Sequence, residues 1–237
     1  MENTVLTRFY DAPPVNRREI LRYAGCAGTD DPEINAALEE CLSEIEGKLS
    51  CKVCFREFEV KEAAGSGHKE SGSAVTVLDL GFAEVTSAGL ALNLRGCGRI
   101  LLFAATIGFE IDRLIAKASR LTPSKALFFQ AIGAERIESL CDMFCTEMRE
   151  EYGKSGLHLR PRFSPGYGDL PLSLQKDIFA VLDCQRKIGV TLNDSLLMSP
   201  SKSVTAVIGI TDEELKCGST VKKCETCTNT NCAYRER

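Results

Sequence analysis

Apolar and polar residues follow one another along this chain in two patterns, which predict both helices and strands. After the acid–proline–acid stretch at 31–33, which is typical of a helix start, apolar residues recur every three or four positions. These residues are Ile34, Leu38, Cys41, Leu42, Ile45 and Leu49. Residues 51–62 have instead the β-branched and aromatic character of a strand. This part of the chain is therefore predicted to form a helix followed by a strand.

The same patterns continue without a regular alternation of strand, helix and strand. Further strands are expected at 73–81, 99–106 and 202–210, and further helices at 87–94, 110–119, 124–151 and 172–187. A parallel sheet needs a crossover helix between successive strands, so this order favours an α+β fold. We expect one domain over residues 1–210, followed by a cysteine-rich tail over 211–237.

Charge and hydropathy exclude several classes of protein. The 237 residues include 29 Lys and Arg against 33 Asp and Glu, which gives a formal net charge of −4. A general nucleic-acid-binding protein carries a basic excess, so nucleic acid is not an expected partner. The first residues do not resemble a secretory signal, and the longest apolar run, 100–109, is shorter than the about 20 residues that cross a bilayer. We therefore expect a cytoplasmic protein with no membrane partner.

Twelve cysteines without a secretory signal predict buried thiols or a metal site in place of a disulfide framework. Cys141 and Cys145 lie four positions apart on a helical pattern and should share one face. Cys51 and Cys54 lie three positions apart on a predicted strand, so their side chains should point to opposite faces. We interpret both pairs as buried small apolar residues.

The cysteines of the tail form a different pattern. A Cys-x-x-Cys pair is followed by a third cysteine after four residues, and a fourth cysteine precedes the group. The four are Cys217, Cys224, Cys227 and Cys232. Zinc prefers four thiolates at such spacings, whereas the spacing differs from the run that holds bacterial iron–sulfur clusters. The tail therefore predicts a zinc site. The alternatives are an iron–sulfur cluster, reduced thiols or a disulfide. A metal-binding or redox protein that uses these cysteines remains an alternative function.

Residues 77–89 imitate the first motif of Rossmann-like methyltransferases, in which a glycine-rich turn approaches S-adenosylmethionine. Such a turn needs glycines just after Gly81, but Phe82, Ala83 and Glu84 stand there. We interpret the stretch as an ordinary strand and turn. A self-contained methyltransferase remains an alternative, although no acceptor base is evident.

A more specific candidate site lies in a proline-bounded turn ahead of the helix expected at 172–187. Arg162 can hold a carboxylate through two hydrogen bonds, and Gly166 permits a backbone conformation that a side chain would prevent. Tyr167 offers a flat ring to another ring or to a cation, and the helix start favours an anion. The turn suits a zwitterionic ligand with an aromatic or cationic part. The alternative is a rigid surface turn in which Arg162 pairs with a neighbouring acid.

The sequence Arg-x-x-x-Gly-Tyr at 162–167 resembles the S-adenosylmethionine-binding motif of the activation domain of cobalamin-dependent methionine synthase. The resemblance covers residues 135–210 and continues into a second motif after the helix. Its matching residues are Gly189, Leu192, Ser195, Met198, Pro200, Ser203 and Val204. Residues 15–26 and 224–235 are similar to the stand-alone version of this domain found in some anaerobic bacteria.

The resemblance implies an α+β fold in which helices flank an antiparallel sheet. It implies an accessory role: the domain presents S-adenosylmethionine to an oxidised cobalamin, which is then reduced and remethylated. The cobalamin would belong to a partner methionine synthase or a related corrinoid protein, and an electron donor such as flavodoxin or ferredoxin would supply the electron. The chain has no recognisable homocysteine, folate or cobalamin site, so we expect no catalysis by the chain alone.

The same resemblance implies roles for residues of the turn. Arg162 would hold the ligand carboxylate, Gly166 and Tyr167 would shape its pocket, and Ser164 would contribute a backbone contact.

One acid of a preceding helix would also contact the polar groups of the ligand. Glu138 matches that acid, with Glu135 as the alternative register. The family has a tyrosine in its last strand that this chain lacks. Ile208 lies near the corresponding place.

Overall fold

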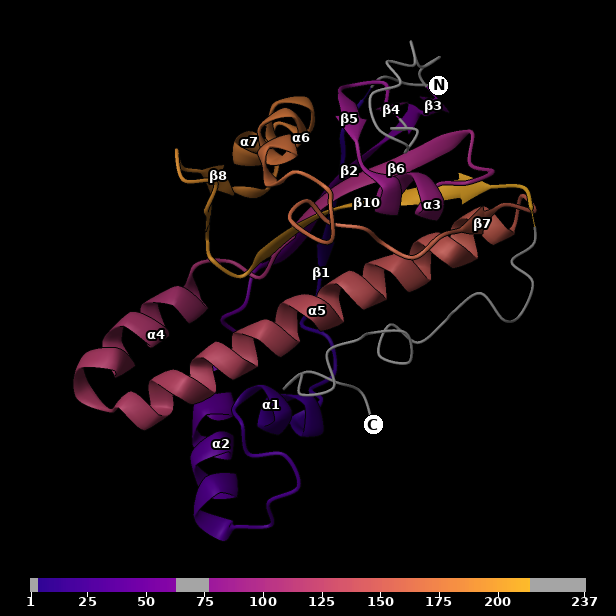
Figure 1. Ribbon diagram of the computed structural model, residues 1–237. Coiled ribbons are helices and arrows are strands. Elements are labelled where there is room, and N and C mark those ends of the chain that lie inside the picture. Colours follow the sequence, from indigo (N-terminus) through magenta and orange to yellow (C-terminus); the bar gives the residue numbers. More distant parts are fainter. Residues whose placement is uncertain (1–3, 63–76, 214–237) are drawn as a thin grey trace, which may run out of the picture.

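The computed structural model describes residues 4–62 and 77–213 of the chain (Figure 1). Within these residues, a five-stranded sheet in the order β1–β2–β6–β10–β7 forms the centre, and every neighbouring pair is antiparallel. The strands are β1 (Leu6–Tyr10), β2 (Cys51–Glu59), β6 (Arg99–Thr106), β10 (Ser203–Thr211) and β7 (His158–Leu159). Cys54, Ala104 and Thr205 form one row across the three central strands.

One side of the sheet carries a helical layer, which consists of α1 (Arg17–Tyr23), α2 (Pro32–Ile45), α4 (Glu110–Leu121) and α5 (Pro123–Gly153). The long helix α5 runs along this side of the sheet, and α1, α2 and α4 pack against α5 (Figure 1). The helix start predicted at 31–33 is confirmed, because Asp31 Oδ1 accepts a hydrogen bond of 2.8 Å from Glu33 N.

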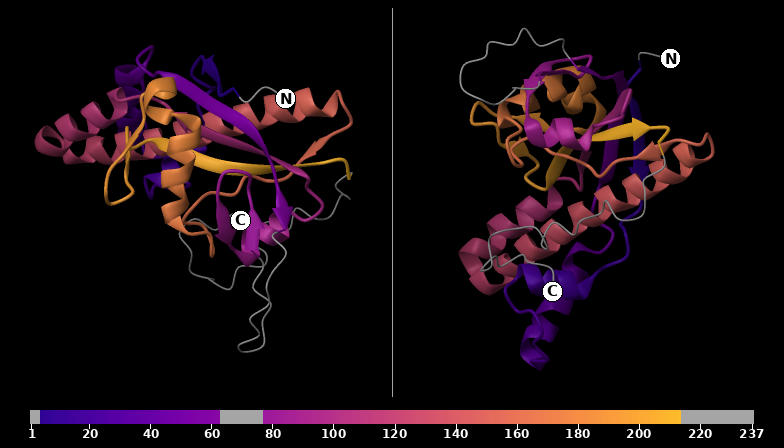
Figure 2. Two further views of the ribbon diagram at one scale, coloured as in Figure 1. Left: turned by 90° about the horizontal axis from the view of Figure 1, so that it is seen from above. Right: turned by 45° about the vertical axis from the view of Figure 1, so that its right-hand side comes forward.

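The other side carries a mixed layer, which faces the viewer in the left view of Figure 2 and lies at the top of the right view. The helical elements of this mixed layer are α3 (Ala88–Asn93), the 3-10 turn η1 (Leu172–Leu174), α6 (Gln175–Leu182) and α7 (Cys184–Ile188). Its small strands are β3 (Lys61–Glu62), β4 (Val77–Asp79) and β5 (Glu84–Thr86). A short pair, β8 (Thr191–Leu192) and β9 (Met198–Ser199), follows α7.

Because both faces of the sheet are covered, its strands bury side chains on both sides. In β6, Leu101 and Phe103 belong to the core under the helical layer, whereas Ile100 and Leu102 belong to the core under the mixed layer. This explains why residues 99–106 are almost continuously apolar.

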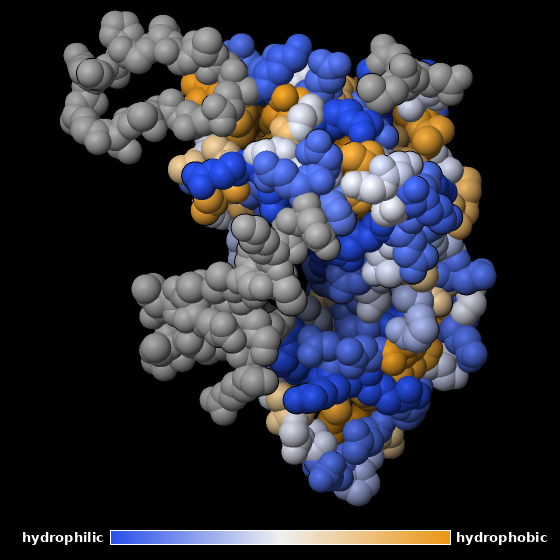
Figure 3. All heavy atoms as spheres, turned by 90° about the vertical axis from the view of Figure 1, so that its right-hand side faces the viewer, coloured by the Kyte–Doolittle hydropathy of each residue, from blue (hydrophilic) through white to orange (hydrophobic). Residues whose placement is uncertain are grey.

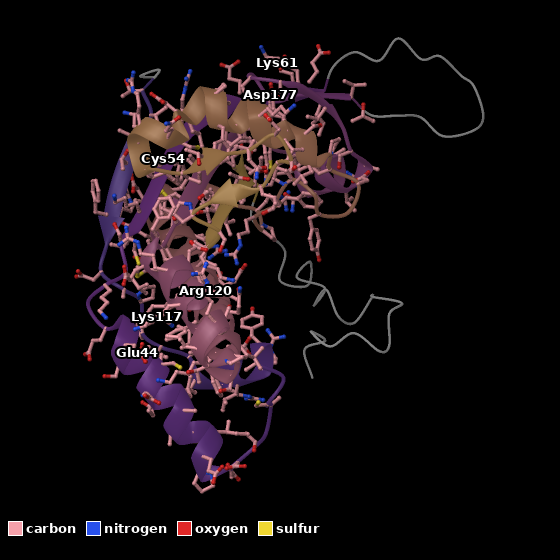
Figure 4. The ribbon with its side chains drawn as sticks, turned by 90° about the vertical axis from the view of Figure 1, so that its left-hand side faces the viewer. Glu44, Cys54, Lys61, Lys117, Arg120 and Asp177 are labelled. Carbon is pink, nitrogen blue, oxygen red and sulfur yellow. The ribbon has the colours of Figure 1, made fainter. Side chains whose placement is uncertain are left out.

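The four cysteines predicted to be buried are buried. Cys51 belongs to the core of the helical layer and Cys54 to that of the mixed layer, so they point to opposite faces as predicted. In Figure 4, Cys54 lies near the helices of the mixed layer and Glu44 lies on α2 at the opposite end of the molecule. Cys141 and Cys145 share the inner face of α5, and burial raises the pKa of both thiols.

Residues 77–86 form a strand, a turn and a second strand, and α3 begins at Ala88, so the turn at Gly81 joins two strands and not a strand to a helix as in a Rossmann-like motif. β4 pairs antiparallel with both β3 and β5, and Leu80 N donates to Ala83 O at 3.0 Å. Gly81 occupies this turn with a φ of +76°. The interpretation as an ordinary strand and turn is confirmed.

The prediction of one helix over 172–187 is wrong in one respect. Asp183 has a left-handed φ of 49° and divides the segment into α6 and α7 after the turn η1. The predicted end of the segment at 187 agrees with the structure to within one residue, since α7 ends at Ile188 and Gly189 caps it with a φ of 75°. The pattern also did not predict β1, α1 and the short strands β5, β7, β8 and β9.

No helix in residues 4–62 or 77–213 combines the length and the apolar character that a membrane crossing requires. The division into a domain over 1–210 and a tail over 211–237 stays a prediction.

Candidate functional site

The segment after β7 runs antiparallel to β10 and brings Arg162 to the helical layer. Arg160 N donates to Gly209 O at 2.8 Å, and Phe163 and Val207 exchange two backbone hydrogen bonds of 2.8 and 2.9 Å. Phe163 packs against the core of the mixed layer. Side chains of an extended segment alternate between faces, so Arg162 points to the opposite side, where α5 lies. Figure 1 shows this segment returning from β7 between α5 and α3.

The Arg162 turn, defined here as residues 162–170, closes through a glycine. Tyr167 N donates to Ser164 O at 3.1 Å across Pro165 and Gly166. Gly166 has a φ of +82°, which is the left-handed conformation that the third position of a type II turn requires. The geometry therefore explains the glycine of the motif.

Asp169 fixes the Arg162 turn to the start of α3. Its carboxylate accepts hydrogen bonds from Ser87 Oγ at 2.5 Å, Ala88 N at 2.6 Å and Gly89 N at 3.1 Å. The bond from Ser87 and those from the backbone lower the pKa of Asp169. Sequence reasoning missed Asp169, because nothing in the pattern connects it to residues some 80 positions earlier.

Arg162 lies between two acids of α5. Its Nη1 donates to Asp142 Oδ1 at 2.5 Å, and its Nη2 donates to Glu138 Oε2 at 2.5 Å. The two acids are four residues apart, so they occupy the same face of the helix. Desolvation lowers the pKa of Arg162, but the neighbouring Cys141 and the two carboxylates outweigh it and raise the pKa above its ordinary value. Asp142 was not among the predicted site residues.

The structure brings Glu138, and not Glu135, to Arg162. Glu135 is buried and forms an ion pair with the equally buried Arg136. It also accepts hydrogen bonds from Asn16 N at 3.1 Å and from Ser139 Oγ at 2.7 Å. Glu135 therefore faces the segment before α1, away from the Arg162 turn.

Tyr167 and Ile208 stand at the two positions where the resemblance concerns a tyrosine. The ring of Tyr167 meets that of Phe163 edge-on, with centroids 5.8 Å apart, and Tyr167 is 53% exposed. Ile208, which stands near the place of the family's tyrosine, is 1% exposed and belongs to the core under α5.

The site is open to solvent. The side chains of Glu138 and Asp142 are 46% and 72% exposed, whereas that of Arg162 is 24% exposed. Figure 3 shows the side of the molecule that includes the end of α5, and its middle is mainly hydrophilic. Two cavities of about 600 and 580 Å³ lie elsewhere, and no residue of the Arg162 turn lines either of them. The two acids beside Arg162 are therefore accessible to solvent in the described part of the chain.

Among residues 4–62 and 77–213, no group of three or more His, Cys, Asp and Glu side chains is arranged to hold a metal ion. The predicted zinc ligands Cys217, Cys224, Cys227 and Cys232 lie outside the described residues. The zinc site therefore stays a prediction from the sequence.

A sequence model of one protein family matches residues 97–216, which is half of the chain. That model describes the activation domain of vitamin B12 dependent methionine synthase. The chain belongs to this family. The matched residues include the Arg162 turn, and membership implies a role in the S-adenosylmethionine-dependent reactivation of cobalamin. The resemblance inferred from the motifs is thereby confirmed.

A comparison with solved structures confirms the fold. The chain is similar to a crystal structure of the MetH reactivation domain bound to AdoHcy, with a TM-score of 0.60 and 15% identity. The similarity covers 90% of this chain and 80% of that chain. The α+β fold with helices flanking an antiparallel sheet is thus that of this activation domain. No curated protein matches the chain.

Proposed function

We propose that this chain binds S-adenosylmethionine at the Arg162 turn and serves the remethylation of a cobalamin that a partner protein holds. The observation that carries the proposal is the position of Arg162, which begins the Arg-x-x-x-Gly-Tyr sequence that resembles the family's motif and lies beside Glu138. The MetH reactivation domain of similar fold was crystallised with AdoHcy, the demethylated form of the same ligand, which supports this chemistry.

The groups at the turn match the parts of the ligand. Arg162 would bind the ligand carboxylate, Glu138 its ammonium group, and the exposed ring of Tyr167 its adenine or sulfonium. Ser164 and Gly166 would offer backbone groups at the tight turn. A guanidinium has five N–H donors, and the bonds to Glu138 and Asp142 use two of them. Arg162 can therefore hold a third carboxylate without releasing both acids.

The ion pairs of Arg162 also fit the alternative of a structural turn without a ligand. The two interpretations differ in whether the affinity for S-adenosylmethionine depends on Arg162. A turn with a purely structural ion pair predicts no such dependence.

Binding to the variant Arg162→Ala tests the proposal by isothermal titration calorimetry. Charge-assisted hydrogen bonds of this kind are worth about 1.5–3 kcal/mol, so the affinity should fall by about one to two orders of magnitude. Arg186→Ala is the matched control, since Arg186 is also paired with an acid, Asp183, at 2.8 Å, and lies outside the Arg162 turn. Equal affinity of the wild type and Arg162→Ala for S-adenosylmethionine would show that the turn is not the ligand site.

In this role the chain is an accessory protein. Its partner would be a cobalamin-dependent methionine synthase or a related corrinoid protein, and flavodoxin or ferredoxin would supply the electron. A self-contained methyltransferase would need an acceptor and a base beside the sulfonium, and the one carboxylate within the Arg162 turn, Asp169, is instead bonded to the start of α3.

A further inference from the structure

The charges around Arg162 do not balance. One guanidinium faces two carboxylates, Glu138 and Asp142, so this three-residue cluster carries a net charge of −1. A single acid would be enough to neutralise Arg162. The second acid, Asp142, is the most exposed of the three and adds a negative charge that no other ion pair of the described residues compensates.

The neighbouring charges leave this excess in place. On the side of α1, Arg22 is paired with Glu19 at 2.6 Å. Burial and then the Glu138 carboxylate raise the pKa of Tyr23, so α1 borders the cluster. Arg149 follows Asp142 by seven residues, a rise of about 10 Å along the axis of α5. Among the described residues, the ion pairs of Asp142 and Glu138 are those with Arg162 and do not include Arg149.

The ligand of the proposed function changes its charge when it reacts. S-adenosylmethionine has a carboxylate, an ammonium and a sulfonium, a net charge of +1. When the methyl group is transferred, the sulfur–carbon bond breaks and the sulfur keeps its electron pair. The methyl acceptor, a reduced cobalt of the partner, supplies the pair for the new bond. The product, S-adenosylhomocysteine, contains a neutral thioether and has no net charge.

We propose that the cluster of Arg162, Glu138 and Asp142 distinguishes the substrate from the product by charge, with Asp142 as the residue that provides the discrimination. This inference rests on the proposed function. The net negative cluster attracts the cationic substrate and has no net attraction for the neutral product. Loss of the methyl group therefore weakens binding and favours release of the product.

The variant Asp142→Asn tests this in the full chain. It keeps the size of the side chain and makes the cluster neutral. Calorimetry with each ligand should show that the preference for S-adenosylmethionine over S-adenosylhomocysteine falls about three- to tenfold, as expected for one charge at surface distances. The affinity for S-adenosylhomocysteine should change little. Raising the salt concentration should reduce the preference of the wild type and leave that of the variant nearly unchanged.

Glu150→Gln is the matched control, because it removes one exposed negative charge from the same helix, two turns beyond Asp142. It should keep the wild-type preference. An equal loss of affinity for both ligands in Asp142→Asn would assign Asp142 a structural role and overturn the inference, as would an unchanged preference. If the wild type binds neither ligand, the proposed function falls and the inference falls with it.

Discussion

At the scale of single residues, the direction of Arg162 follows from the backbone on either side of it. The segment is held to β10 at Arg160 and Phe163, and the alternation of side chains sends Arg162 to α5. The turn beyond it is fixed by Gly166 and by the carboxylate of Asp169. The chemistry of the site therefore depends on backbone geometry as much as on the charged groups.

Gly166→Ala is expected to strain the Arg162 turn. The φ of +82° costs about 1–2 kcal/mol for a residue with a Cβ, and that Cβ would lie 3.1 Å from Leu172 Cδ1. Urea unfolding should show a loss of stability of this size, together with weaker binding of S-adenosylmethionine.

The matched control for this substitution is Gly153→Ala. Gly153 ends α5, its added Cβ would meet nothing within 4 Å, and no positive φ is present there. This variant should be as stable as the wild type or slightly more stable. Equal stability of Gly166→Ala and the wild type would show that the turn tolerates a side chain.

At the scale of elements, α5 organises both the site and the start of the chain. One face presents Glu138 and Asp142 to the Arg162 turn. Another face holds the buried Arg136, whose guanidinium donates to the carbonyl oxygens of Pro13 and Pro14 and pairs with Glu135. The same helix therefore fixes the segment that leads from β1 into α1.

Arg136→Met is expected to destabilise the protein by about 3–5 kcal/mol, because it leaves the Glu135 carboxylate buried without its partner. Chemical denaturation measures the loss. The double variant Glu135→Leu with Arg136→Met removes both charges and should be more stable than the single variant. Wild-type stability of Arg136→Met would contradict this role of the pair.

Most elements could be predicted from the sequence, because their signals are local. The apolar run of β6 and the capping acid of α2 identify those elements without knowledge of the fold. The break at Asp183 could not be predicted, since a left-handed aspartate within a helical pattern has no local signal. The contacts of Arg162 with Asp142 and of Asp169 with α3 depend on how the layers pack. The sequence therefore indicated the turn and Glu138, but not Asp142 or the role of Asp169.

At the scale of the whole molecule, the site lies where the two layers meet at the sheet. The Arg162 turn is bonded to β10, to α5 of the helical layer and to α3 of the mixed layer. Family membership implies a role in cobalamin reactivation. The accessory role proposed above would require a second protein.

The accessory role predicts activity only in a mixture. With S-adenosylmethionine and a reductant, the chain should restore activity to an oxidised methionine synthase that lacks its own activation domain. Alone, it should form no methionine from homocysteine. The variant Arg162→Ala is the control and should restore less activity at limiting S-adenosylmethionine. Methionine formed without a corrinoid partner would favour the self-contained enzyme, and no restoration by the wild type would contradict the accessory role.

The bonding of the Arg162 turn to both layers has a consequence for folding. Its contacts join residues that are 20 to more than 80 positions apart, so the site does not exist until distant parts of the chain have come together. An unfolded chain would then have no affinity for the ligand, and ligand binding would draw the folding equilibrium toward the native state. At a ligand concentration a hundred times its dissociation constant, this linkage adds about 2.7 kcal/mol to the free energy of unfolding. The supply of S-adenosylmethionine would thus govern how long the chain persists, as well as whether it can act.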